Sequence, residues 1–115
     1  MQRGEVHMVD FGPAIGSEVA QRRPAVIVSN NAANAAANLT GRGVITVVPL
    51  TSNADRILPF QVFVEVANTE LRVDTKAQAE QIRSVATSRI GDRMGVLPFE
   101  LMERLDDALR LHLDL

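Results

Sequence analysis

The chain has 115 residues, of which 46% are hydrophobic, and its 12 basic and 14 acidic side chains give a formal net charge of −2. This composition excludes an intrinsically disordered chain and a broadly basic nucleic-acid-binding surface, and the lack of cysteine excludes disulfides and thiolate metal sites. We find neither a signal-peptide pattern nor an apolar run of bilayer length. We therefore expect a cytoplasmic protein without membrane spans, folded as a single domain over residues 1–115.

Four segments in the first two thirds of the chain predict β-strands. Residues 4–11 and 58–66 alternate apolar and polar side chains, and residues 23–30 and 43–51 are rich in β-branched side chains. Between them, the stretch 30–43 consists largely of Ala, Asn and Gly, which predicts a surface loop with room for one helical turn. Short strands with loops between them indicate a compact β-barrel or sandwich.

The last third of the chain changes its period. Residues 98–113 carry apolar side chains at helical spacing, with Pro98 in the first turn and with Arg110 and His112 in the last turn, where each is favoured. This segment predicts an α-helix. Residues 75–90 are rich in Ala, Gln, Glu and Arg, so their composition alone also favours a helix. The expected fold class is therefore mainly β with a C-terminal helix, an α+β arrangement.

Polar residues gather at the ends of the predicted strands. Arg22 and Arg23 precede a buried-looking strand, where Pro24 holds Arg23 extended on a rigid platform suited to binding phosphate. Thr51 and Ser52 end another strand, where hydroxyls can donate to a phosphoryl oxygen. Each pair also suits a simpler interpretation, the first as solvated arginines at a loop end and the second as the start of a turn.

Two further polar groups are equally ambiguous from the residues alone. Ser17 and Glu18 place a hydroxyl and a carboxylate on a predicted loop, and Glu80, Gln81 and Arg83 form a second polar group. Both groups suit a solvated surface as well as they suit a binding site.

The sequence lacks the motifs of several enzyme classes. His7 and His112 lie on separate predicted elements, which gives no support to a histidine acid–base pair, and His7 suits a packing or surface role better than that of a ligand. No carboxylate–imidazole spacing typical of a metal site, no phosphate-binding loop and no nucleophile elbow occurs. A catalytic site in this chain is expected to use Arg, Ser, Thr, Glu and Gln, with no metal and no cofactor.

The order of these motifs resembles that of the MazF/PemK toxins. That family opens with Arg-Gly-Asp/Glu, a strand ending Val-Asp, a Pro-x-x-Gly-Ser-Glu loop, and Arg-Pro before an apolar strand and a Ser-Asn turn. VITVVPLTSN at 44–53 resembles its strand end, and AEQIRSV at 79–85 with Arg89 resembles its Gln-Ile-Arg element. The opening motifs correspond to Arg3-Gly4-Glu5, Val9-Asp10, residues 13–18, Arg23-Pro24 and Ser29-Asn30, and Gly95 precedes the matching C-terminal helix.

The resemblance implies an SH3-like or CcdB-like β-barrel that forms a symmetric homodimer. It implies that residues 72–83 are mainly strand and that only the segment after Ser84 is helical. It further implies a sequence-specific, metal-independent endoribonuclease toxin that cleaves single-stranded RNA. Such a toxin is neutralised by a cognate antitoxin with an acidic, partly disordered tail. Many relatives carry Trp or Tyr at the position of His7. This chain has neither residue, so we expect no aromatic base stacking at that position.

On this resemblance the RNA 2′-hydroxyl is the nucleophile, and four residues form the catalytic group. Arg23 would stabilise charge on the phosphoryl oxygens and donate a proton, and the Thr51 hydroxyl would hold the scissile phosphate. Ser52 would add a donor, and Glu18 is the candidate base because its loop borders the site. RNA contacts are expected from Ser17, Arg22, Arg42, Asn53, Arg56 and Gln81.

Two other functions fit parts of this pattern. A gyrase-poisoning toxin of the CcdB type would share the fold and act by binding a protein. A non-catalytic SH3-like module would act only as an interaction partner. The presence of Arg23 and Thr51 in their expected places argues against the gyrase poison. The full set of polar site positions argues against the interaction module, since a pure scaffold has no reason to keep them all.

Overall fold

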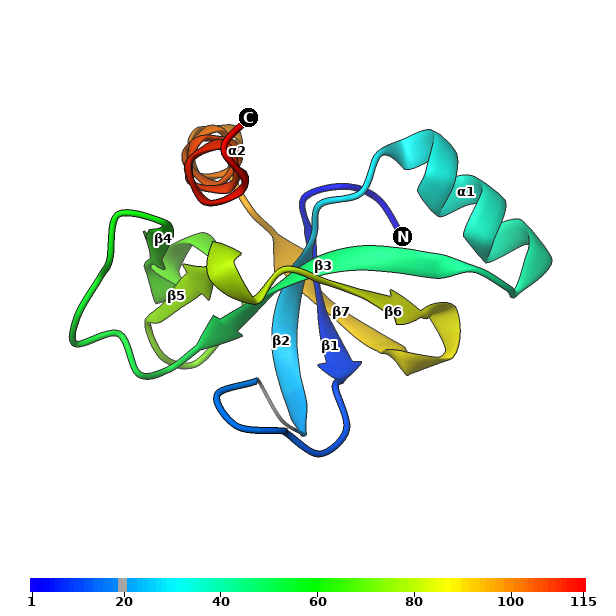
Figure 1. The fold of residues 1–115 in the computed structure, drawn as a ribbon, viewed down its shortest axis with the longest axis horizontal. Coiled ribbons are helices and arrows are strands. Elements are labelled where there is room, and N and C mark those ends of the chain that lie inside the picture. The colour runs from blue at the N-terminus through cyan, green and yellow to red at the C-terminus, as the bar shows by residue number, and fades with distance from the viewer. Residues whose placement is uncertain (19–20) are drawn as a thin grey trace.

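The structure is a computed structural model that describes residues 1–18 and 21–115, and within them it contains a seven-stranded sheet and two α-helices (Figure 1). All strand pairings are antiparallel, in the order β4-β5-β3-β2-β1-β7, and β6 also pairs with β3. The strands are β1 (Glu5–Asp10), β2 (Arg22–Ile27), β3 (Val44–Thr51), β4 (Gln61–Val64), β5 (Thr75–Gln78), β6 (Arg83–Ala86) and β7 (Ile90–Val96). The helices are α1 (Asn31–Thr40) and α2 (Phe99–Leu113), with the 3-10 helices η1 (Val66–Asn68), η2 (Ala79–Gln81) and η3 (Thr87–Arg89).

The long strand β3 organises the sheet because it pairs along both of its edges. One edge pairs with β2, and the other pairs first with β6 and then with β5. Since successive side chains of a strand point to opposite faces, β3 contributes to two separate cores. Ile45 and Val47 lie in one buried cluster with Val9 of β1, whereas Val48 and Leu50 lie in the other.

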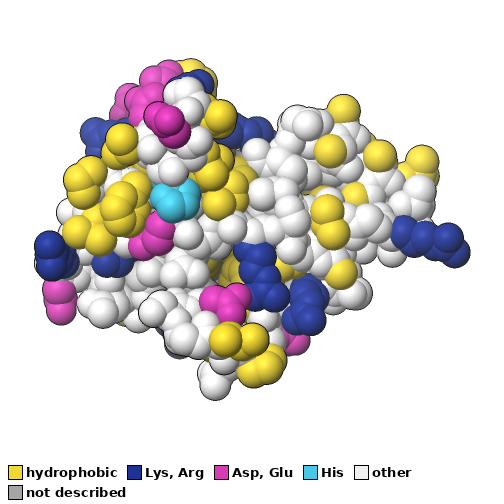
Figure 2. Space-filling view, in the orientation of Figure 1, with side chains coloured by type: hydrophobic (Ala, Val, Ile, Leu, Met, Phe, Trp, Pro, Cys, Tyr) yellow, Lys and Arg dark blue, Asp and Glu magenta, His cyan; other side chains and the backbone are white. Residues whose placement is uncertain are grey.

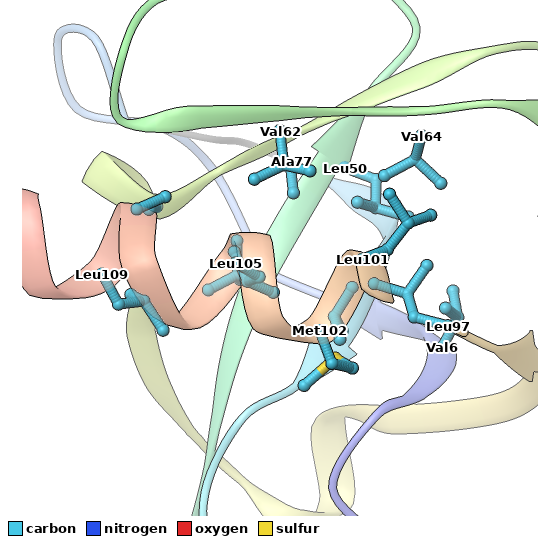
Figure 3. Close-up of a cluster of buried hydrophobic side chains, with 14 of the residues drawn as sticks. Val6, Leu50, Val62, Val64, Ala77, Leu97, Leu101, Met102, Leu105 and Leu109 are labelled. Atoms are coloured by element: carbon cyan, nitrogen blue, oxygen red, sulfur yellow. The ribbon is translucent and has the colours of Figure 1, made fainter. Parts of the chain in front are cut away.

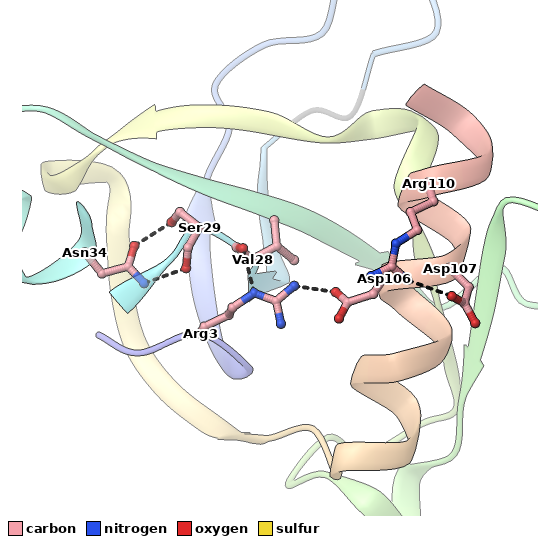
Figure 4. Close-up of polar contacts among 7 residues, drawn as sticks. All are labelled: Arg3, Val28, Ser29, Asn34, Asp106, Asp107 and Arg110. Atoms are coloured by element: carbon pink, nitrogen blue, oxygen red, sulfur yellow. Dashed lines mark hydrogen bonds and ion pairs between the residues drawn. The ribbon is translucent and has the colours of Figure 1, made fainter. Parts of the chain in front are cut away.

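Helix α2 covers the second of these cores. Leu101, Leu105 and Leu109 recur at helical spacing, are buried, and lie against side chains of the sheet (Figure 3). An ion pair between Arg3 and Asp106 ties the helix to the start of the chain (Figure 4). The predicted C-terminal helix is therefore confirmed. Among the described residues, neither this helix nor any other is long and apolar enough to cross a membrane.

The prediction of a loop over 30–43 is wrong, because most of this stretch forms helix α1. The side chain of Asn30 caps the helix by accepting a backbone amide hydrogen bond of 2.8 Å, and Gly41 ends it with a φ of 66°. Asn34 is fully buried and exchanges hydrogen bonds with Ser29 (Figure 4). Asparagine thus serves here as a cap and a buried anchor, and not as a turn former.

The helix expected after Ser84 is also wrong. The chain continues there as β6, a single 3-10 turn and β7. Pairing decides the outcome, because Val85 lies opposite Ile45 of β3 and both side chains are buried. The strands expected over 58–66 and 72–83 are present but shorter, as β4 and β5.

Candidate functional site

The ends of β2 and β3 bring Arg23 and Thr51 to one face of the sheet. Arg23 lies opposite Val9 of β1, a residue of the first core, so its side chain is on the face of that core. Ala25 pairs with Pro49, and Arg23 and Thr51 each lie two residues beyond this last pair, so each shares the face of its paired neighbour. The alternation of side chains therefore puts the guanidinium and the hydroxyl on the same side, at adjacent strand ends.

The neighbouring residues Arg22 and Ser52 belong to a cavity at these strand ends. The cavity has a volume of about 270 Å³ and includes part of Arg23 in its wall. It also contains Arg72, from the segment before β5, and Thr75, the first residue of β5. We call it the arginine cavity. Its full lining is Gln21, Arg22, Arg23, Pro24, Leu50, Ser52, Leu71, Arg72, Val73 and Thr75.

A second cavity, of about 230 Å³, is lined by Glu18 of the predicted loop and by the polar group Glu80, Gln81 and Arg83. The Gln81 side-chain amide donates to the Ser17 carbonyl over 3.0 Å, which fastens the loop after β1 to η2. Glu18 lines this cavity with Arg83, whose guanidinium donates to the Phe11 carbonyl at 3.1 Å and lies 5.8 Å from the Phe11 ring centre. The structure thus brings Gln81 to Ser17 and Glu18, although Gln81 is far from this pair in sequence.

The segment after β3 holds the remaining candidates. Thr51 is only 8% exposed, and its hydroxyl oxygen accepts from the Asn53 backbone amide at 3.3 Å. Ser52 and Asn53 are exposed, as is Arg56, whose carbonyl oxygen accepts from the Lys76 ammonium of β5 at 2.7 Å. The segment is therefore held beside the strand end, with its polar side chains available to a ligand.

Arg42 lies far from Thr51, at the opposite end of β3. It lies before β3, whereas Thr51 ends that strand. Eight residues of β3 extend about 25 Å at the usual rise of a strand. A contact between Arg42 and the same ligand would need an RNA that reaches across the whole sheet.

His7 is part of the scaffold and not of this site. It is 7% exposed, with Nε2 2.8 Å from a Glu5 carboxylate oxygen and Nδ1 2.9 Å from the Gly91 carbonyl oxygen. Burial alone would raise the pKa of the Glu5 carboxyl, but the hydrogen bond with His7 lowers this pKa below its ordinary value of 4.5. The hydrogen bond between His7 and Gly91 connects β1 to β7, in agreement with a packing role for His7. Over residues 1–18 and 21–115, no cluster of three or more His, Cys, Asp or Glu side chains is arranged to hold a metal ion.

Sequence reasoning did not find Arg72 or Thr75. Both follow a segment without a recognisable motif, and their proximity to Arg22 depends on the pairing of β5 with β3. The sequence offers only one weak signal, since both residues fall within the strand that the resemblance implies over 72–83.

Residues 2–113 match the family model described as PemK-like, MazF-like toxin of type II toxin–antitoxin system. The chain belongs to this toxin family. The endoribonuclease MazF9 of Mycobacterium tuberculosis strain H37Rv is 56% identical over 115 residues, covering 100% of this chain and 98% of the relative. The endoribonuclease EndoA of Bacillus subtilis strain 168 is 28% identical, covering 100% of this chain and 96% of the relative.

Solved structures of MazF toxins share the fold. MazF from Deinococcus radiodurans superimposes with a TM-score of 0.81 at 26% identity, covering 100% of this chain and 97% of that one. A mycobacterial endoribonuclease, solved in complex with its cognate antitoxin, gives a TM-score of 0.77 at 27% identity, with coverage of 100% and 96%. These relationships support an endoribonuclease toxin of the MazF type and do not favour a gyrase poison or an inert interaction module.

Proposed function

We propose that this MazF-type toxin cleaves single-stranded RNA at short sequence motifs, without a metal ion, and uses the RNA 2′-hydroxyl as the nucleophile. The observation that carries the proposal is the common face of Arg23 and Thr51 at the neighbouring ends of β2 and β3. A guanidinium and an alcohol held on one rigid edge can engage the same phosphodiester.

The proposed chemistry has three parts. The 2′-hydroxyl must lose a proton, the phosphoryl oxygens gain negative charge, and the departing 5′-oxygen must gain a proton. Arg23 carries a permanent positive charge and stabilises the phosphoryl oxygens, with Thr51 and Ser52 as hydroxyl donors. Glu18 is the proposed base, since it lines the second cavity from the loop that leads into β2. Arg23 also donates a hydrogen bond to the departing 5′-oxygen, which takes its proton from solvent water.

The bases beside the cleaved bond would be read by polar side chains around these strand ends. Ser17 and Gln81 are linked by a hydrogen bond next to Glu18, which supports a role for this group in positioning the RNA. Arg22, Asn53 and Arg56 contribute further donors from the strand ends and from the segment after β3. Arg42 is proposed to contact a more distant part of a long RNA.

We further propose that two chains form a symmetric homodimer of SH3-like barrels. An exposed apolar surface lies over α2 and β4, where hydrophobic side chains gather (Figure 2). It includes Ile57, Phe63 and Leu111, which are 40%, 37% and 59% exposed, around a hollow of about 570 Å³. An apolar patch of this kind favours burial against a second copy, and closed two-fold pairing is the commonest arrangement. A stable monomer at micromolar concentration in light scattering would contradict this part.

The proposed regulator is a cognate antitoxin with an acidic, partly disordered tail. The mycobacterial and deinococcal relatives have been solved in complexes with their own antitoxins. Arginines at the strand ends of this chain would attract an acidic tail, and the tail would then compete with RNA for the same edge.

The decisive variant is Arg23→Ala, compared with Arg93→Ala, which removes the same charge from an exposed position on β7. Loss of the positive charge at the transition state should reduce cleavage of a long single-stranded RNA by about a hundredfold or more. Arg93→Ala should cleave normally, both variants should remain folded, and EDTA should not inhibit. A folded and fully active Arg23→Ala protein would overturn the assignment, and strong inhibition by EDTA would overturn metal independence.

A further inference from the structure

The arginine cavity has features that the catalytic assignment does not explain. Its wall carries Arg22 and Arg72 in addition to Arg23, and no carboxylate contributes to it. The second cavity, by contrast, is lined by both Glu18 and Glu80. Arg22 and Arg72, in a wall that contains no carboxylate, make a local positive field that favours an anion.

The charges of this cavity are not used elsewhere in the described structure. Within residues 1–18 and 21–115, Arg22 and Arg72 form no ion pair and no side-chain hydrogen bond. Asp74 is close in sequence, but its carboxylate accepts from the backbone amide of Val66 at 2.7 Å and is thereby occupied. The two guanidinium groups are therefore free to bind a ligand.

Thr75 supplies an independent indication of a ligand. It is only 4% exposed and lines the cavity beside Leu50, yet its hydroxyl has no hydrogen-bond partner. Buried hydroxyls are nearly always partnered, because leaving one unsatisfied lowers the stability of the fold. A volume of about 270 Å³ is several times the share of one water molecule, so the cavity has room for a larger polar group.

We propose that the arginine cavity binds a phosphate of the RNA strand next to the cleaved linkage, through Arg22, Arg72 and the Thr75 hydroxyl. This inference rests on the proposed function and deepens it, since it adds a binding subsite beside the catalytic pair. An RNA phosphate is favoured over an antitoxin carboxylate because Arg23 forms part of the same wall. A strand whose scissile phosphate meets Arg23 therefore has its neighbouring phosphates within reach of the cavity.

The test uses the full-length protein and a single-stranded RNA of mixed sequence in which every 2′-hydroxyl is methylated. Methylation removes the nucleophile, so binding is measured without cleavage. Affinity is followed by fluorescence anisotropy over a series of salt concentrations for the wild type, Arg72→Ala, Thr75→Val, Thr75→Ser and Arg93→Ala. Thermal unfolding of each variant checks the fold.

The phosphate subsite predicts a different signature for each variant. Arg72→Ala should weaken binding about tenfold and reduce the slope of log affinity against log salt by about 0.7, the value for one phosphate contact on a single strand. Thr75→Val should also weaken binding about tenfold, by the loss of a charge-assisted hydrogen bond, without changing the slope. Thr75→Ser keeps the hydroxyl and should bind like the wild type, and Arg93→Ala should leave the slope unchanged.

Stability gives a second readout at Thr75. Replacing an unpartnered buried hydroxyl by a methyl group of similar shape should leave the melting temperature of the free protein unchanged or raise it. A marked fall for Thr75→Val, with Thr75→Ser unaffected, would show that the hydroxyl has a structural partner and would overturn the proposal.

Further results would overturn the subsite. Equal slopes for Arg72→Ala and the wild type would do so, as would a wild type that fails to bind the RNA. If Arg72→Ala and Thr75→Val bound poly-glutamate more weakly than the wild type but bound RNA equally well, the cavity would be assigned to an acidic peptide instead. A wild type that shows the predicted binding signature but does not cleave unmodified RNA would refute the nuclease while the subsite stands.

Discussion

Thr51→Val separates the catalytic role of one hydroxyl from its structural role. Valine keeps the β-branched shape of threonine, so a side chain that is 8% exposed retains its packing at the end of β3. The hydroxyl makes one hydrogen bond, a 3.3 Å contact from the Asn53 amide, and Asn53 is exposed to water that can replace it. The free energy of unfolding should therefore fall by only about 0.5–1 kcal/mol.

This loss corresponds to a small change in melting temperature. An unfolding entropy of about 2.1 cal/mol/K per residue gives about 0.24 kcal/mol/K for 115 residues, so the melting temperature should fall by about 2–4 °C. Cleavage should fall much further, by about a hundredfold or more, if the hydroxyl holds the phosphate during the reaction.

The matched control is Thr46→Val on the same strand. Its hydroxyl forms an exposed 2.8 Å hydrogen bond with Ser84, away from the strand end that carries Thr51. It should lose comparable stability and keep full activity in a fluorogenic RNA cleavage assay. Near-normal cleavage by Thr51→Val, or an equal loss of cleavage in the two variants, would refute the role assigned to Thr51.

Three further predictions concern the scaffold and the assembly. Leu105→Ala should lower the unfolding free energy by about 3 kcal/mol and the melting temperature by about 12 °C, because Leu105 is fully buried. Leu39→Ala, at an 88% exposed position, should change the unfolding free energy by less than about 0.5 kcal/mol. Similar losses in the two variants would refute the packing of α2. Leu111→Glu should shift a dimer towards monomer in analytical ultracentrifugation, with Leu39→Glu as control, and no shift would contradict the proposed interface. The lowered pKa of Glu5 means that its contribution to stability is complete above its ordinary pKa of 4.5 and is lost as the pH falls through the lower folded value. The stability difference between the wild type and Glu5→Gln, followed by urea unfolding from pH 7 to pH 3, should therefore shrink below pH 4.5, and a constant difference would refute this linkage.

The fold was predictable where one local pattern determines the element. Alternation and β-branched runs predict β1 to β4, and helical spacing predicts α2, because these patterns reflect burial on one face or one stripe. Helix α1 was not predictable in this way. It depends on Asn34, whose side chain is buried against Ser29, and composition cannot distinguish such an anchor from a turn residue.

The candidate site was predictable only in its strand ends. Arg23 and Thr51 lie at the ends of clear strands, but only the resemblance to the MazF/PemK toxins marks them as site residues, because the pattern alone suits solvated or turn residues equally well. Arg72 and Thr75 depend on the path of the chain between β4 and β5, which no local pattern determines. The single-domain extent, the individual site roles and the dimer stay predictions.

The most direct test of the central claim is to map both ends of the fragments that the protein makes from a long, defined single-stranded RNA. Attack by the 2′-hydroxyl, with charge held by Arg23 and Thr51, predicts 2′,3′-cyclic phosphate ends and 5′-hydroxyl ends at a short recurring motif, in the presence of EDTA. Fragments with 5′-phosphate ends, or intact RNA after prolonged incubation with folded protein, would contradict it.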